Sequence, residues 1–224
     1  MSARNAILNK VRAALRTPAD DLERRNAVAS RLRKADAGII PARGQLPPNE
    51  RVELFCAMAE KLFVSVEPLK NRDDVPDAVA TYLREHNLPS SIRMGEDSRL
   101  AAMPWQKQRA LEVKRGPSDG SDAAGVSHAF GGIAETGTVL MVSGADNPTT
   151  INFLPEHHII VIDAAEIEGD LEAALAKVRK LYGKGEMPRT VNLISGPSRS
   201  GDIEQKLILG AHGPRALHLI VVGG

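Results

Sequence analysis

A single carboxylate, Glu135, stands among glycines directly in front of an apolar run in the segment FGGIAETGTVLMVSG, residues 130–144. Gly132 and Gly137 allow the backbone to approach a ligand closely, and Thr136 adds a hydroxyl group beside them. A carboxylate at the mouth of a buried strand costs free energy unless it is paired or used. One interpretation is therefore a catalytic Glu135, with Gly132, Thr136 and Gly137 lining a binding site.

Glu135 also has a structural interpretation, to which we give about equal weight. Its carboxylate would accept backbone N–H groups, or it would pair with an arginine such as Arg199 or Arg215. A cation beside a buried carboxylate stabilises the charged form and also forms part of a polar cleft. An ion pair would therefore fit both interpretations.

A second group of polar residues lies in SGPSRSGDIEQKLILGAHGPRALHLIVV, residues 195–222, directly after another apolar run. Ser200 is a typical N-cap, so the sequence predicts that a helix begins there. The N–H groups, hydroxyls and guanidinium at such a helix start would bind an anion at the carboxyl end of a strand. Because Asp202 and Glu204 oppose a highly charged phosphate, we expect a carboxylate or an acidic loop of a partner. The predicted ligand- or partner-binding residues are Gly196, Ser198, Arg199 and Ser200.

The two groups meet only if the chain before Glu135 reverses direction. If the strands starting at Thr138 and ending at Ser195 were parallel, Glu135 and Arg199 would lie at opposite edges of the sheet. We therefore expect GVSHAFGGIAETG, residues 125–137, to fold back as a short helix and turn. This would place Glu135 in one cleft with Ser198, Arg199 and His212.

The elements that position these residues follow from a change in the sequence near residue 60. Residues 1–60 contain two amphipathic helical patterns and a Pro/Gly-rich linker, GIIPARGQLPPNE, so we expect a helical arm and linker there. The chain does not indicate whether these helices pack on their own subunit or on a neighbour in an oligomer. Residues 61–224 alternate apolar strand-like runs with helical patterns. We predict an α/β domain with a mostly parallel sheet of six to eight strands flanked by helices.

Composition excludes several classes of chemistry. A net charge of +1 gives no field that would hold a nucleic acid or a membrane surface. The single cysteine, Cys56, rules out an iron–sulfur cluster or a Cys-rich zinc site held by this chain alone, and favours a cytoplasmic protein. No apolar stretch is long enough to span a bilayer. We find no Gly-rich nucleotide-binding motif, and we expect no cofactor in this chain.

The adjacent His157 and His158 resemble metal ligands. Neighbouring residues on a strand point to opposite faces, so the two imidazoles cannot hold one ion without distortion. His128, His212, Asp119 and Asp122 have no spacing that requires them to converge. We therefore predict no metal site.

Three segments in this order and spacing are similar to the lactate utilisation protein C family, which is built on the LUD domain. They are GIAETGTVLMVSG, NPTTINFLPEHHIIVID and SGPSRSGDIEQKLILGAHGPRALHLIVV, and the resemblance covers roughly residues 60–224. The third segment usually contains GPSRTADIE in this family, whereas this chain has Ser200 and Gly201 in place of Thr and Ala. Ser200 keeps the capping hydroxyl, and Gly201 loosens the expected helix start.

The resemblance implies a NagB/RpiA/CoA transferase-like sheet and a role in oxidising L-lactate to pyruvate beside iron–sulfur partner proteins. Lactate oxidation passes on two electrons, and the sequence offers no flavin, nicotinamide or cluster site for them. We therefore expect an accessory or assembling subunit with a small-anion or partner-docking cleft. One alternative is a free-standing enzyme that binds acyl-CoA or a sugar phosphate, because CoA transferases use a glutamate near a Glu-x-Gly segment, which Glu135 and Gly137 resemble. A purely structural scaffold is another alternative.

Overall fold

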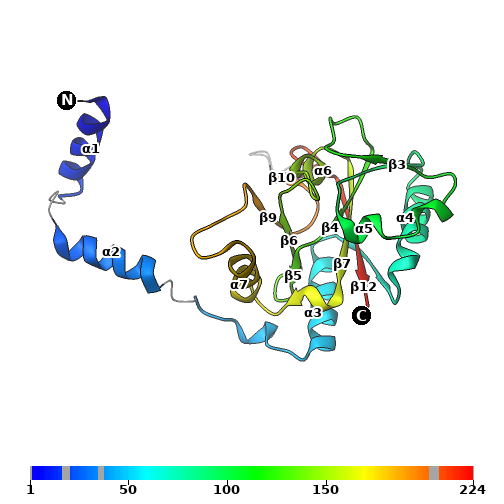
Figure 1. The fold of residues 1–224 in the computed structure, drawn as a ribbon, viewed down its shortest axis with the longest axis horizontal. Helices are drawn as coiled ribbons and strands as arrows, with labels where there is room; N and C mark the ends of the chain where they lie inside the picture. The colour runs from blue at the N-terminus through cyan, green and yellow to red at the C-terminus, as the bar shows by residue number, and fades with distance from the viewer. Residues whose placement is uncertain (1, 17–20, 35–37, 202–206, 224) are drawn as a thin grey trace. The chain divides into compact units, whose positions relative to one another are not determined.

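The computed structural model describes residues 2–16, 21–34, 38–201 and 207–223 (Figure 1). The chain divides into two compact units, residues 1–39 and 40–224, and each is described by itself.

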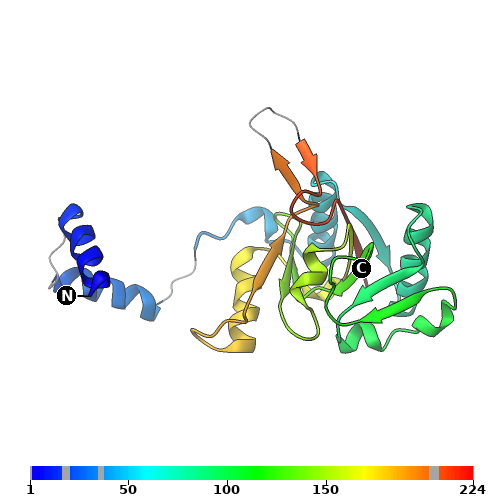
Figure 2. The same ribbon diagram turned by 90° about the horizontal axis from the view of Figure 1, so that it is seen from above.

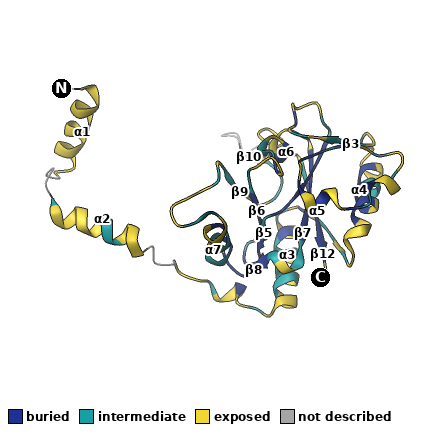
Figure 3. Ribbon diagram, viewed as in Figure 1, coloured by how far each residue is buried: buried dark blue, intermediate teal, exposed yellow. Residues whose placement is uncertain are grey.

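The first unit contains two helices, α1 (Ala3–Ala14) and α2 (Leu22–Lys34), as the amphipathic patterns predict. Ser2 caps α1 by accepting a hydrogen bond from the backbone N–H of Asn5. Neither helix contains a buried residue, and Figure 3 shows both as mostly exposed. Ile7 and Leu15 are each 63% exposed, so the apolar stripe of α1 has no partner among the described residues.

The second unit is built around a parallel sheet of six strands, which confirms the predicted α/β class. The outer strands β1 and β3 begin with polar residues, whereas the central strand β7 is buried along almost its whole length. In spatial order the strands are β1 (Ser65–Leu69), β12 (Ala216–Val222), β7 (His157–Asp163), β4 (Ala124–His128), β2 (Ser91–Met94) and β3 (Glu112–Arg115).

A second sheet of four strands is not anticipated by the sequence. Its order is β8 (Ile167–Glu168), β5 (Gly131–Ile133), β6 (Thr138–Val142) and β9 (Val191–Ile194). The expectation that the strand at Thr138 is parallel to the strand ending at Ser195 is wrong, because β6 pairs antiparallel with both β5 and β9. The turn between β5 and β6 holds only four residues, which permits a hairpin but not the crossover that parallel strands need.

Helices cover both sheets. Helix α4 (Val75–Glu85) and the short α5 (Ser98–Ala101) pack on one face of the six-stranded sheet. The other face packs against α3 (Pro48–Lys61) and the second sheet, whose far side is covered by α7 (Leu171–Tyr182). Helix α6 (Thr149–Phe153) lies beside β4, and short 3-10 turns occupy 42–44, 72–74, 105–107 and 164–166. Figure 3 shows the dark blue strands enclosed between these helices.

The predicted helix from Ser200 to Gly210 is wrong at the residues that the structure describes there. Strands β10 (Arg199–Gly201) and β11 (Leu207–Leu209) form an antiparallel hairpin, which stands out from both sheets in Figure 2. Asp202 and Glu204 lie outside the described residues. The pairing of Ser200 with Ile208 supplies backbone partners across the hairpin, so the N-cap signal of Ser200 is not used.

The predicted short helix within 125–137 is also wrong, because this segment forms β4, β5 and a turn. Its glycines serve packing against the protein itself. Gly137 has a φ of +65°, and a Cβ atom there would lie 2.3 Å from the backbone N of Ala59 in α3. A Cβ on Gly132 would crowd Phe55 of the same helix at 3.0 Å. The close approach that these glycines permit is to α3 and, for Gly132, also to Ile162 of β7.

Replacing Gly137 by Ala is expected to lower the free energy of unfolding by about 3 kcal/mol, because it combines a left-handed backbone with overlap against a helix backbone. Gly185→Ala is the matched control, since Gly185 has a φ of +86° with nothing within 4 Å of its Cβ position. It should cost about 1 kcal/mol. Urea denaturation of both variants measures the difference, and equal losses would show that the contact with α3 is unimportant.

Candidate functional site

The second and third sequence segments meet at the amino ends of β7 and β12 and form a pocket of about 270 Å³, here called the Ser198 pocket. Four of the predicted binding residues line it, although they come from a turn and a hairpin rather than from a helix start. These are Gly196, Ser198, Arg199 and His212. Ser200 lies one residue further along β10 and is not among the lining residues.

The base of the Ser198 pocket is formed by buried polar side chains that the sequence analysis missed. Asn152 of α6 and His158 of β7 both line the pocket. His158 Nε2 lies 3.0 Å from Ser127 Oγ, which in turn donates to Asn152 Oδ1 at 3.3 Å. Burial lowers the pKa of His158 to about 3, so the imidazole is neutral at physiological pH. The available signal was a pair of polar residues inside the apolar run HHIIVID.

The backbone N–H and C=O of Ser198 are both hydrogen-bonded within the protein. The Ser198 N–H donates to Pro214 O at 2.8 Å, and the Gly210 N–H donates to Ser198 O at 3.0 Å. The side-chain hydroxyl of Ser198 accepts only a long bond, 3.4 Å, from the His212 N–H. At Ser198, the side-chain hydroxyl rather than the backbone N–H is therefore available to a ligand.

Arg199 borders two pockets. Its guanidinium lies over the ring of Phe63, 4.2 Å from the centroid, and one of its N–H groups donates to Leu62 O. Arg199 is exposed, and it also lines a pocket of about 380 Å³ that contains Tyr82 and His86. Since a guanidinium has five N–H donors, it can hold its place against Leu62 and still receive a carboxylate.

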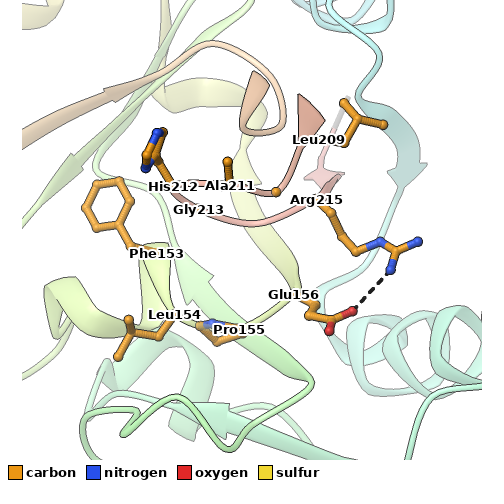
Figure 4. A pocket seen from close by; sticks show the side chains of 10 residues that line it. Phe153, Leu154, Pro155, Glu156, Leu209, Ala211, His212, Gly213 and Arg215 are labelled. Carbon is orange, nitrogen blue, oxygen red and sulfur yellow. Dashed lines mark hydrogen bonds and ion pairs between the residues drawn. The ribbon is translucent and has the colours of Figure 1, made fainter. Parts of the chain in front are cut away.

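A wider pocket of about 720 Å³, here called the Arg215 pocket, adjoins the Ser198 pocket and shares Phe153, His212 and Gly213 with it. Figure 4 shows the side chains of Phe153 and His212 on one side and Arg215 on the other. Arg215 Nη1 lies 3.4 Å from Glu156 Oε2, so Arg215 pairs with this residue and not with Glu135. The Arg215 pocket therefore borders the Ser198 pocket on the side of His212.

Glu135 is not among the residues that line these pockets. Its carboxylate accepts a hydrogen bond from the Leu171 N–H at 3.2 Å, at the first residue of α7, and lies 3.9 Å from Arg43 Nε. A helix N-terminus is a favourable environment for a buried carboxylate. The contacts agree with the structural interpretation, and none of these three pockets brings Glu135 together with Ser198, Arg199 and His212.

The first segment reaches the pocket through hydroxyl groups instead. Thr136 Oγ1 donates to Thr138 Oγ1 at 2.8 Å, and Thr138 Oγ1 lies 2.7 Å from Ser195 Oγ. Ser195 lines the Ser198 pocket. This contact exists because β6 and β9 are antiparallel, which brings the start of one strand beside the end of the other.

His157 faces away from His158, as the alternation of a strand requires. Its Nδ1 lies 2.9 Å from the hydroxyl of Tyr82, whose ring stacks between those of His86 and His218 at 4.0 and 4.5 Å. Within the described residues, no group of three or more His, Cys, Asp or Glu side chains is placed to hold a metal ion. Burial, and next the charge of Glu60, raise the pKa of the Cys56 thiol, which therefore is not activated as a nucleophile.

A polar cluster at the carboxyl ends of β2, β4 and β7 has its charges paired. Arg99 forms a two-pronged ion pair with Asp97, and Arg72 donates to Asp163 at 2.6 Å. His128 Nε2 lies 3.5 Å from Asp163, and burial, followed by the charge of Arg99, lowers the His128 pKa. This is the edge at which open α/β sheets usually bind ligands, and a pocket of about 870 Å³ borders Arg72 and Asp163 there.

Comparison with known proteins identifies the family of the region that contains the three sequence segments. The family model described as the LUD domain matches residues 52–222. The chain belongs to the LUD domain family. A solved structure of a DUF162 family protein from Deinococcus radiodurans covers 80% of this chain and 99% of its own, with a TM-score of 0.61 and 22% identity, and shares the fold of the LUD domain.

Relatives of this LUD domain protein include two proteins named lactate utilization protein C. The one from Shouchella clausii is 38% identical over 90 residues, which cover 40% of this chain and 39% of the relative. The one from Geobacillus thermodenitrificans is 37% identical over 107 residues, covering 46% and 45%. These matches therefore span less than half of each relative. The uncharacterized protein YkgG of Escherichia coli is 27% identical over 240 residues, covering 99% of both chains. No helix within the described ranges is long and apolar enough to cross a membrane.

Replacing Glu135 by Ala is expected to lower the free energy of unfolding by about 1–2 kcal/mol, because the Leu171 N–H loses its acceptor. Glu135→Gln keeps an acceptor and should cost only about 0.5 kcal/mol, the loss of charge at a helix N-terminus. Urea denaturation measures both values. A Glu135→Ala protein as stable as the unmodified chain would contradict the structural role.

The neutral, buried His158 predicts a pH dependence of stability. The unfolded chain binds a proton at His158 near pH 6.5, whereas the folded chain does so only near pH 3. The stabilisation is therefore fully present above pH 6.5 and is lost as the pH falls from 6.5 towards 3. Between pH 6 and 4, the free energy of unfolding should fall more steeply than in His158→Gln, by roughly 1 kcal/mol per pH unit. Identical slopes would show that His158 is protonated in the folded protein.

Proposed function

We propose that this chain is a component of an L-lactate utilisation system and assists the oxidation of L-lactate to pyruvate together with iron–sulfur proteins. Membership of the LUD domain family supports this, as do relatives that are named lactate utilization protein C. One observation carries the proposal. Two of the segments that resemble that family converge on the Ser198 pocket, where they contribute Asn152, Ser198, Arg199 and His212.

The chemistry of the pocket suits a small carboxylate. The hydroxyls of Ser195 and Ser198 and the guanidinium of Arg199 are hydrogen-bond donors of the kind that recognise carboxylates. A volume of about 270 Å³ lies at the lower end of ligand pockets, which suits an acid of a few carbon atoms. In this proposal the chain binds the acid and its partner proteins carry the electrons.

The alternative of a CoA-transferase-like enzyme would make Glu135 a nucleophile. Its carboxylate is engaged by the start of α7 and by Arg43, and the residue is 6% exposed. A nucleophile needs access to its substrate, and Glu135 does not border the pockets described above. These contacts favour the lactate proposal over the alternative.

The proposal is tested by isolating the tagged chain from its own cells and assaying the isolate for L-lactate oxidation with a dye acceptor. We expect iron–sulfur proteins in the isolate and a loss of lactate oxidation in cells that lack the chain. His212→Ala should reduce the activity at least fivefold, because it alters the wall shared by the Ser198 and Arg215 pockets.

Arg109→Ala is the control, since Arg109 is exposed and does not line either pocket. It should retain full activity with the same melting temperature. Unchanged growth on L-lactate after deletion of the chain would overturn the proposed function.

A further inference from the structure

Two buried polar atoms in residues that line the Ser198 pocket have no hydrogen-bond partner among the described residues. They are Nδ2 of Asn152 and Nδ1 of His158, in residues that are 1% and 0% exposed. Both side chains line the pocket. An unpaired polar atom in the interior costs free energy, so a native protein that keeps two of them in the lining of one pocket has a reason beyond packing.

The hydrogen-bond network assigns a role to each atom. Ser127 has one hydroxyl proton, which it donates to Asn152 Oδ1, so its oxygen accepts from His158 Nε2–H. The neutral imidazole then carries its proton on Nε2 and leaves a bare lone pair on Nδ1. Asn152 Nδ2 can only donate. The base of the pocket therefore offers one acceptor and one donor.

We propose that Asn152 and His158 bind the hydroxyl group of a small hydroxy acid and so determine the specificity of the site. The ligand O–H donates to His158 Nδ1, and its oxygen accepts a hydrogen bond from Asn152 Nδ2. A keto oxygen can only accept, and a methylene group can do neither, so both leave at least one of the two atoms unpaired. The carboxylate of the same ligand is bound by Arg199 and Ser198 at the mouth.

The charge state of His158 supports this assignment. Burial holds the imidazole neutral, which keeps the Nδ1 lone pair available throughout the physiological range. Ser127, which fixes the tautomer, is itself 3% exposed and lies on β4, beside β7 in the sheet. The three side chains come from α6, β4 and β7, so their arrangement depends on the whole fold and not on one loop.

The identity of the acid as lactate rests on the proposed function, whereas recognition of a hydroxyl group does not. Isothermal titration of the purified chain with L-lactate, pyruvate and propionate separates a hydroxyl, a keto group and a methylene on the same three-carbon acid. We expect L-lactate to bind at least tenfold more tightly than propionate, with pyruvate between them. Equal affinities for L-lactate and propionate, or no binding of L-lactate at millimolar concentration, would overturn the proposal.

Substitutions of the residues beneath the Ser198 pocket test which of them cause the preference for L-lactate over propionate. Asn152→Leu removes the amide donor and keeps a similar volume. Ser127→Ala removes the hydroxyl that holds the His158 proton on Nε2. Each variant should reduce the ratio of lactate to propionate affinity to below threefold. Asn192→Leu is the matched control, because Asn192 also has an unpaired amide but does not line the pocket. It should keep the full ratio. A ratio that survives Asn152→Leu would overturn the role of the base.

Nitrogen-15 chemical shifts of His158 provide a readout that does not depend on affinity. They should show a proton on Nε2, and the Nδ1 signal should move when L-lactate is added but not when propionate is added. A proton on Nδ1 would overturn the assignment. Normal growth on L-lactate without a hydroxyl preference would refute only this inference, whereas a clear preference in a chain that is dispensable for growth would refute only the proposed function.

Discussion

Strand β7 places the adjacent His157 and His158 on opposite faces of a sheet that is covered on both sides. Each buried imidazole therefore needs a polar partner from a neighbouring element. A buried imidazole needs a hydrogen-bond partner on its own face. His157 has Tyr82 of α4 as its partner, and His158 has Ser127 of β4. On the His158 side, the series of hydrogen bonds runs from His158 through Ser127 to Asn152 and ends there. Asn152 Nδ2 and His158 Nδ1 therefore have no partner among the described residues. Because neighbouring residues of a strand point to opposite faces, His157 joins the buried ring cluster around Tyr82. His158 points to the other face and lines the Ser198 pocket.

The second sheet supplies the opposite wall of that pocket, and its form follows from one short turn. Four residues between β5 and β6 enforce a hairpin, and β9 then adds antiparallel to β6. This register sets Thr138 beside Ser195 and so delivers the Gly196–Arg199 turn to the ends of β7 and β12. The glycines of the same hairpin allow it to lie directly on α3. The first segment therefore shapes the site by holding the second sheet in place, without Glu135 entering the pocket.

The parts of the fold that the sequence predicts well are those whose signals are local and continuous. Apolar runs such as HHIIVID and LHLIVV correspond to the central strands, and the amphipathic patterns correspond to α1, α2, α4 and α7. The partner of Glu135 lies 36 residues away, and no spacing rule connects it to the start of α7. The hairpin at 199–209 was missed because a serine followed by acidic residues is a helix signal only if the chain continues as a helix. Asn152 carries no signal of its own, since a buried amide is distinguished only by the atoms around it.

The two edges of the parallel sheet hold their charged side chains differently. Open α/β sheets commonly bind ligands at their carboxyl edge, where helix N-termini and loops converge. Here Asp97 pairs with Arg99 and Asp163 pairs with Arg72, beside a pocket of about 870 Å³ that also contains Lys70 and Lys107. At the amino edge Arg199 is held by a carbonyl and an aromatic ring, which fix its position without cancelling its charge. An arginine that keeps its charge, in a pocket whose lining residues keep unpaired polar atoms, suits the amino edge to a small polar anion.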